Sequence, residues 1–104
     1  LKAVTMLSGG SNMVTGDYPG WKYRKDSPLR DKMTCLYEKM YGKKPKVEAI
    51  HAGLECGILG SKIRDLDCVS IGPDMSCIHT TEETLSIAST RRVWEFLVRL
   101  LEEK

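Results

Sequence analysis

The chain has 104 residues, of which 41% are hydrophobic and 29% are charged, and its net charge is +2 at neutral pH. This size and composition predict one small globular domain or part of a larger one. The small net charge, with acidic and basic residues mixed along the chain, argues against a surface for nucleic acid or membrane. The basic run at 22–30 is interrupted by Asp26 and is typical of a solvated face.

The four cysteines, at positions 35, 56, 68 and 77, form no C-x-x-C pair. Their spacing therefore indicates neither a zinc knuckle nor a thioredoxin-type redox site. Cys35 and Cys68 have apolar neighbours and are predicted to be small buried residues of a reduced, cytoplasmic protein. We expect no signal peptide and no transmembrane run. Because the chain begins at Leu1 rather than at methionine, we expect it to be processed or excised from a longer protein.

The first segments predict a helix, a strand and a turn. Residues 1–7 contain good helix formers with apolar side chains at the first, fourth and seventh positions, and the Ser-Gly-Gly at 8–10 ends the helix. Residues 12–18 are predicted to form a strand. Residues 18–21 form a turn whose two aromatic side chains we interpret as packing residues rather than as a ligand cage.

The segment from Ser27 to Gly42 has the pattern of a capped amphipathic helix. Ser27 is a suitable N-cap and Pro28 suits the first helical position. Apolar residues then recur at helical spacing, and Gly42 ends the run. We place this helix at 28–41.

Two more strands and two more helices follow. Residues 46–52 predict a strand of mixed faces, and 54–63 a short helix packed back on the sheet. Residues 68–71 predict a short buried strand. Ser86 caps a final amphipathic helix, whose apolar side holds Ile87, Val93, Phe96, Leu97, Leu100 and Leu101.

The alternation of helices and strands predicts an α/β fold with a short, partly parallel sheet and flanking helices. In such sheets, functional residues gather in the loops at the carboxyl ends of the strands. Two loops fit this description, at 51–55 and 72–83. Adjacent parallel strands would bring both loops to one edge of the sheet.

His79, in the second loop, has the chemistry of a metal ligand, because neutral imidazole binds zinc well. Asp74, Glu82 and Glu83 are near enough in sequence to orient its ring. The local sequence alone favours the alternative of a surface histidine followed by helix-capping residues. The chain has only two histidines and no H-x-D or H-E-x-x-H motif, so any further ligands must come from another segment or chain.

His51 and Glu55, in the first loop, also have two interpretations. Glu55 near a helix N-terminus favours the helix dipole, and His51 suits a half-buried structural position. A functional role for the pair is the less favoured alternative from the local residues.

The chain contains five distinctive motifs: GDYPGW at 16–21, DSPLRDKM at 26–33, EAIHAGLECGILGSKI at 48–63, VSIGPDM at 69–75 and IHTTEETLSI at 78–87. Together these motifs resemble the C-terminal part of the aminoacyl-histidine dipeptidases. This family is also called the Xaa-His dipeptidases, peptidase D or bacterial carnosinase, and it lies within the co-catalytic zinc peptidase superfamily. The resemblance extends from Gly16 onward and is less distinct over 1–15.

The resemblance implies a fragment of a zinc-peptidase-type catalytic domain. Residues 1–17 would end the lid or dimerisation domain, and 18–104 would form the C-terminal half of the catalytic domain. It implies a site with two zinc ions, for which manganese or cobalt can substitute, and it makes His79 the last metal ligand in chain order. The other ligands and the general base would lie upstream, outside this chain.

The resemblance also implies a substrate-facing role for the HAGLE motif. His51, Gly53 and Glu55 match this motif and would line the substrate side of the cleft. Glu55 would hold the free amine of a dipeptide, and His51 its carboxylate or a water molecule.

The implied function is metal-dependent hydrolysis of Xaa-His dipeptides in the cytoplasm, in which two metal ions activate a water molecule. The expected partners are a dipeptide, the missing N-terminal half of the catalytic domain and further copies of the protein. The chain alone is expected to be inactive, metal-free or weakly metal-binding, and prone to self-association. The alternatives are a stand-alone, non-catalytic α/β interaction module and a related dipeptidase of different specificity.

Overall fold

The computed structural model describes residues 1–50 and 54–103, and the predicted helices are confirmed within them. Helix α2 has the bounds that the sequence predicts, and the other helices differ from prediction by one or two residues at their ends. The elements are α1 (Lys2–Leu7), α2 (Pro28–Tyr41), α3 (Glu55–Lys62), β1 (Met75–Ser76), β2 (Thr84–Leu85) and α4 (Ile87–Glu102).

Helix α2 begins and ends at the residues that its sequence signals indicate. The Ser27 side chain accepts a hydrogen bond from the Arg30 backbone N–H at 3.1 Å, and Pro28 occupies the first turn. The helix ends at Gly42, which has a φ of 70° and so adopts the left-handed conformation that favours glycine. These local signals position the apolar face of α2 toward α4.

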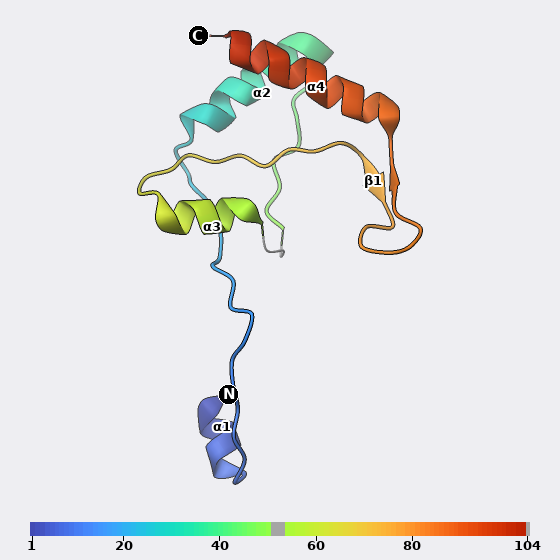
Figure 1. The fold of residues 1–104 in the computed structure, drawn as a ribbon. Helices are drawn as coiled ribbons and strands as arrows, with labels where there is room; N and C mark the ends of the chain where they lie inside the picture. The colour runs from blue at the N-terminus through green and yellow to red at the C-terminus, as the bar shows by residue number, and fades with distance from the viewer. Residues whose placement is uncertain (51–53, 104) are drawn as a thin grey trace.

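The hydrophobic core lies between α2 and α4 (Figure 1). Met33 and Leu36 from α2 and Phe96 from α4 are its buried members, and Val69 packs against them from an extended segment. The Tyr37 ring meets Phe96 edge-on, with a centroid distance of 6.0 Å. Three buried apolar side chains among the described residues make a small core, so this helix pair supplies most of the local stability.

Helix α3 packs against residues 19–21 through a close approach at Gly57. A Cβ added to Gly57 would lie 2.7 Å from the Pro19 carbonyl oxygen and 3.6 Å from the Trp21 Cβ. The predicted helix is confirmed, but the prediction that it packs back on the sheet is wrong, because its neighbour is the turn at 18–21. The GDYPGW and HAGLECG motifs therefore meet in space.

The predicted strands are wrong over the described residues. Segments 12–18, 46–50 and 68–71 form no strand, and the paired strands of the described chain are β1 and β2, which run antiparallel. A strand requires a neighbour to pair with its backbone, and the described residues supply none to these segments. The partly parallel sheet is therefore not confirmed. Strand β1 lies within the predicted loop at 72–83, and β2 directly follows that loop. Both strands are too short to show an alternating pattern of apolar and polar residues.

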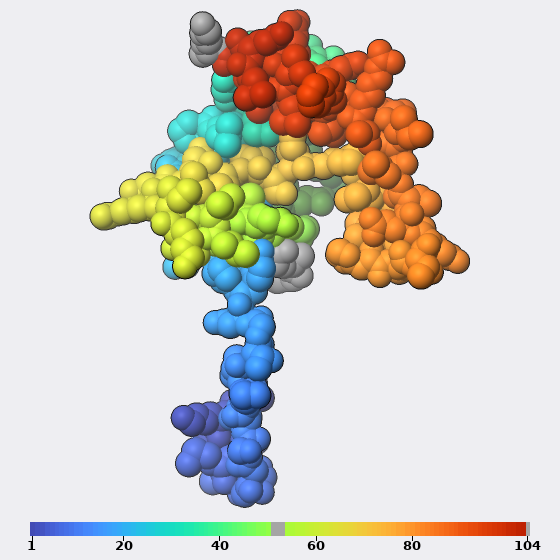
Figure 2. Space-filling view, viewed as in Figure 1, coloured from blue at the N-terminus to red at the C-terminus, as the bar shows by residue number. Residues whose placement is uncertain are grey.

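The overall shape is extended. The radius of gyration is 18.9 Å, whereas a compact chain of about 100 residues has a value of about 13 Å. Helix α1 and the segment that follows it project away from the remaining elements (Figures 1 and 2). The predicted domain boundary after residue 17 stays a prediction. None of the described helices has the length and apolar character needed to cross a membrane.

Asp67 adds a long-range cap to α2. Its Oδ1 accepts a hydrogen bond from the buried Ser27 hydroxyl at 2.6 Å, and its Oδ2 accepts one from the Leu29 backbone N–H at 3.0 Å. The Ser27 hydroxyl and then the Leu29 amide lower the pKa of the Asp67 carboxyl below its ordinary value of 3.8. This contact ties the segment before 68–71 to the start of α2.

We predict a pH-dependent loss of stability through Asp67. Because its pKa is lower in the folded than in the unfolded chain, its stabilisation is present above pH 3.8 and is lost as the pH falls through the folded pKa. The free energy of unfolding of the natural chain and of Asp67→Asn should therefore converge as the pH falls below 3.8. Urea titrations across this range test it, with Asp17→Asn as the exposed control. A pH-independent difference would contradict the prediction.

We also predict that Gly57→Ala destabilises the chain by about 1–3 kcal/mol, because its methyl group would overlap the Pro19 carbonyl oxygen. The matched control is Gly60→Ala in the same helix, whose Cβ would meet nothing within 4 Å. That control should stabilise α3 by about 0.5–1 kcal/mol. Urea unfolding of both variants measures the difference, and equal effects would show that the contact is not tight.

Candidate functional site

The candidate site is centred on the loop that joins β1 to β2. Cys77 and His79 have φ values of 52° and 63°, in the left-handed region that non-glycine residues rarely adopt. The Thr80 hydroxyl donates to the Cys77 carbonyl at 2.6 Å and accepts from the Glu82 backbone N–H at 3.2 Å. The polar groups of the loop therefore hold a conformation that its backbone would otherwise disfavour.

Glu83 holds His79 in this loop through the main chain. The Glu83 Oε2 accepts a hydrogen bond from the His79 backbone N–H at 2.8 Å. In the described part of the chain, none of the three predicted carboxylates bonds to the imidazole of His79. The expectation that they orient the ring is therefore wrong in detail, because Glu83 acts on the backbone and Asp74 pairs with α4.

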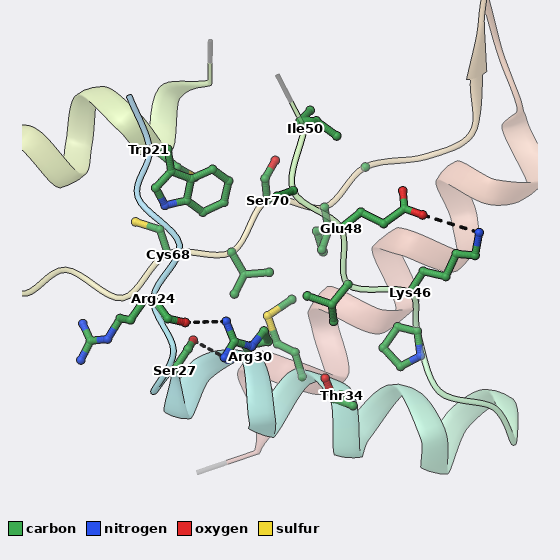
Figure 3. Close-up of a pocket in the computed structure, with 18 of the residues that line it drawn as sticks. Trp21, Arg24, Ser27, Arg30, Thr34, Lys46, Glu48, Ile50, Cys68 and Ser70 are labelled. Atoms are coloured by element: carbon green, nitrogen blue, oxygen red, sulfur yellow. Dashed lines mark hydrogen bonds and ion pairs between the residues drawn. The ribbon is translucent and has the colours of Figure 1, made fainter. Parts of the chain in front are cut away.

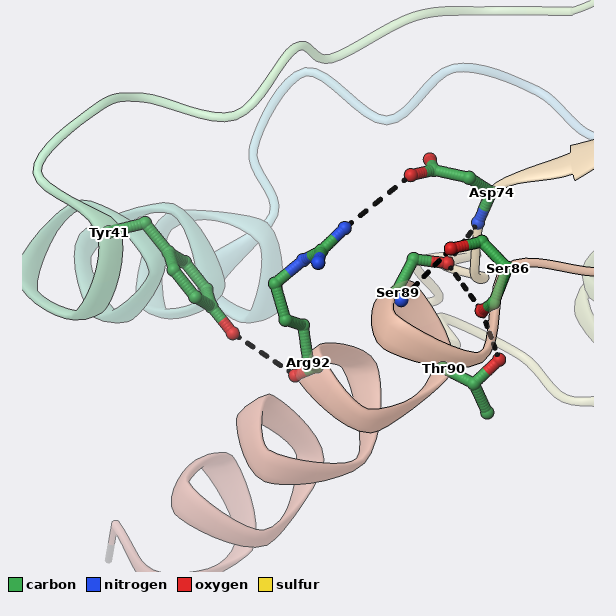
Figure 4. A network of polar contacts seen from close by, with 6 residues as sticks. All are labelled: Tyr41, Asp74, Ser86, Ser89, Thr90 and Arg92. Carbon is green, nitrogen blue, oxygen red and sulfur yellow. Dashed lines mark hydrogen bonds and ion pairs between the residues drawn. The ribbon is translucent and has the colours of Figure 1, made fainter.

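The Gly-Pro-Asp stretch before β1 is anchored to the start of α4 (Figure 4). The Asp74 backbone N–H donates to the buried Ser89 hydroxyl at 2.8 Å, and the Ser86 backbone N–H donates to the Asp74 carbonyl at 2.9 Å. The Asp74 Oδ2 lies 3.6 Å from the Arg92 Nη2. Sequence reasoning missed Ser89, whose position inside a helix carries no local signal. This network fixes the base of the hairpin on α4.

The His79 side chain is exposed at the tip of this anchored hairpin. Within residues 1–50 and 54–103, no group of three His, Cys, Asp or Glu side chains could hold a metal ion. One exposed imidazole with an ordered backbone fits a shared metal site, to which other ligands are added from outside. It does not fit a complete metal site, because such a site needs more ligands than this chain's two histidines supply.

The other predicted site residues lie in or beside the first loop. His51 and Gly53 fall outside the described residues. Glu55 is the exposed first residue of α3, where a carboxylate interacts favourably with the helix dipole. In the described chain, no hydrogen bond or ion pair joins Glu55 to the hairpin loop. The expected meeting of the two loops at one edge stays a prediction.

A cavity of about 1560 Å³ separates the α2–α4 pair from α3 (Figure 3). Extended segments 45–50 and 68–72 line it. Burial, and secondarily the neighbouring Cys56, raises the pKa of the Cys68 thiol, so this residue is a neutral thiol rather than a nucleophile. The prediction that Cys35 and Cys68 are buried is wrong for Cys35, which is exposed on α2, and Cys68 is only partly buried.

Comparison with known proteins identifies relatives among the dipeptidases. No family model matches the chain. The chain is 35% identical over 103 residues to the cytosol non-specific dipeptidase of Escherichia coli (strain K12), a match that covers 99% of this chain and 21% of that protein. The crystal structure of aminoacylhistidine dipeptidase from Vibrio alginolyticus superposes with a TM-score of 0.78 at 38% identity, over 96% of this chain and 20% of that one.

The chain is therefore similar to part of two dipeptidases over nearly its whole length, and it spans about one fifth of the length of both relatives. The resemblance to the C-terminal part of these dipeptidases, which the sequence motifs indicate, is confirmed.

We predict that Glu83→Ala opens the His79 loop. Loss of the carboxylate leaves the His79 N–H without its acceptor, so its exchange with solvent should accelerate by about tenfold, equivalent to about 1.4 kcal/mol. Glu83→Gln keeps a carbonyl acceptor and should retain most of the protection. Amide exchange measured by NMR tests both, with Glu82→Ala as the control in the same loop. Equal protection in Glu83→Ala and the natural chain would rule out this role.

Proposed function

We propose that this chain contributes His79 and the 51–55 segment to the active site of a metal-dependent dipeptidase. The observation that carries this proposal is the match to two dipeptidases over nearly the whole chain. The exposed imidazole on an anchored hairpin supports it, because a ligand offered to a shared site must be both accessible and fixed in place.

The donor chemistry fits a divalent transition metal. Neutral imidazole suits zinc, and also manganese or cobalt as alternatives, and the proposed full site holds two such ions. The remaining ligands and the carboxylate base are proposed to come from the part of the dipeptidase that lies outside this chain. Bound metal would supply Lewis-acid activation of water and of the peptide carbonyl. The role of this chain is to hold the His79 nitrogen toward that metal, and the chain alone is proposed to be inactive.

The proposed substrates are dipeptides with C-terminal histidine. The name of the Vibrio alginolyticus relative supports this class, and the name of the Escherichia coli relative favours a broader dipeptidase as the second candidate. Glu55 would bind the substrate's protonated amine, because its carboxylate is exposed at the start of α3. His51 would bind the substrate carboxylate or a water molecule, and Gly53 would allow close approach.

The proposed partners and location follow from the same relatives. The dipeptide, the remaining part of the catalytic domain and further copies of the protein are the proposed partners. The Escherichia coli relative is named as a cytosol enzyme, which supports a cytoplasmic location.

The test is a chimera in which this chain replaces the matching 103 residues of the Escherichia coli dipeptidase. His79→Ala should lower both the metal content and the hydrolysis of Xaa-His dipeptides, the latter by more than about 100-fold. Glu55→Ala should instead raise KM while the metal content stays unchanged. Elemental analysis and steady-state kinetics measure these effects.

Thr81→Ala is the matched control, because Thr81 is an exposed residue of the same loop as His79. It should leave the metal content and the rate unchanged. Full metal occupancy and full activity in His79→Ala would refute the ligand assignment. A comparison of rates on dipeptides with and without histidine separates the two proposed substrate classes.

A further inference from the structure

The hairpin that carries His79 is bonded to the rest of the described chain at its base. Every residue from 75 to 85 is exposed, so apolar packing does little to fix the direction in which the hairpin points. Its ladder pairs two residues of β1 with two of β2, and an isolated two-stranded hairpin is at best marginally stable in water. The contacts between the base of the hairpin and α4 therefore determine where the His79 loop lies.

One buried hydroxyl group joins the two ends of the hairpin (Figure 4). The Ser89 Oγ accepts a hydrogen bond at 2.8 Å from the backbone N–H of Asp74, the residue directly before β1. The same hydroxyl donates at 3.1 Å to the backbone carbonyl of Ser86, the residue directly after β2. Ser89 is only 4% exposed, so water competes little for these bonds. A single side chain of α4 therefore holds both strands of the hairpin.

The ion pair at the base of the hairpin is the weaker contact. The Asp74 Oδ2 lies 3.6 Å from the Arg92 Nη2, and the side chains of Asp74 and Arg92 are 82% and 53% exposed. Exposed ion pairs contribute little, because water screens them and both side chains lose freedom. A buried polar group that loses its partner is costly by comparison, since it has also given up its water. The hydroxyl of Ser89 is therefore the main attachment of the hairpin to α4.

We propose that Ser89 is a positioning residue for the metal ligand, because its hydroxyl holds the hairpin in the direction in which His79 binds a divalent transition metal. Ser89 touches neither metal nor substrate in this proposal, since it acts through the backbone of Asp74. The inference rests on the proposed function and deepens it by naming the residue that sets the affinity of the site for metal. Contacts that orient a metal ligand typically change metal affinity by about 10–100-fold.

The first test measures the direction of the hairpin in this chain, without metal. In Ser89→Ala the Asp74 N–H loses its acceptor, so its exchange with solvent should accelerate by about tenfold. The residual dipolar couplings of residues 75–85 should then no longer fit the orientation of α4. Both quantities are measured by NMR and are independent of the proposed catalysis. Unchanged exchange and unchanged couplings in Ser89→Ala would overturn the proposal.

The second test measures zinc affinity in the chimera with the Escherichia coli dipeptidase, by titration against a competing chelator. Ser89→Ala should weaken zinc binding by about tenfold although His79 is still present. Ser89→Cys nearly keeps the size of the side chain but replaces the oxygen with sulfur, which is a weak acceptor, so it should weaken zinc binding in the same direction. Circular dichroism verifies that each variant is folded, and Ser89→Cys decides the test if Ser89→Ala does not fold.

Thr90→Ala is the matched control, because the Thr90 hydroxyl donates to the same Ser86 carbonyl, at 2.9 Å, from the next residue of α4. Within the described residues, the Thr90 side chain makes no hydrogen bond to Asp74. Asp74→Asn is a second control, because it removes the ion pair with Arg92 but keeps the backbone N–H that Ser89 binds. Both controls should change zinc affinity by less than about twofold.

The outcomes distinguish this inference from the proposed function. Loss of zinc in His79→Ala together with normal zinc affinity in Ser89→Ala would leave the proposed function standing and overturn the role of Ser89. Normal zinc binding in His79→Ala would refute the ligand assignment, and this inference with it. An equal loss of zinc affinity in Thr90→Ala and Ser89→Ala would show a general loosening of the start of α4, and it would also overturn the positioning role.

Discussion

The unsatisfied backbone of segments 46–50 and 68–71 is the constraint on which most other features of this chain depend. Strands are stable only as members of a sheet, since each backbone group needs a partner across the gap. Without such partners in the described residues, the middle layer stays open and a cavity remains between the helices. The same absence leaves Ile50 and Ile71 partly exposed and limits the core to three buried side chains. The open middle layer and the small core therefore have one cause.

The helices form despite this open layer because the residues that start and end each helix lie within its own sequence. Ser27, Pro28 and Gly42 define α2 from within its own sequence, and Ser86 does the same for α4. These elements could be predicted from the sequence alone, and α2 was predicted with the bounds that the structure has. The strands could not, because an alternating or apolar run shows only that a segment suits a sheet, and pairing depends on residues far away. Long-range contacts such as Asp67 with Ser27 were invisible for the same reason.

The sequence identified His79 as the candidate metal ligand, but it did not show which contacts hold the His79 loop in place. The residues around His79 favour a plain surface histidine when they are considered alone, and only the combined motifs of the family indicate a metal ligand. The structure adds a physical reason for the loop sequence. Left-handed backbone at His79 is costly for a residue with a side chain, and the Glu83 carboxylate compensates by binding the amide. The spacing of four residues between them is not a helical pair, so no helix rule would have revealed this contact.

The proposed site residues stand on separate elements. The hairpin with His79 is fixed to α4 through Asp74 and Ser89, whereas Glu55 begins α3. In the described part of the chain, no hydrogen bond or ion pair joins Glu55 to the hairpin loop. The distance between the proposed metal ligand and the proposed amine-binding carboxylate is therefore set by how α3 and α4 are held relative to each other, and not by a direct contact between the two residues.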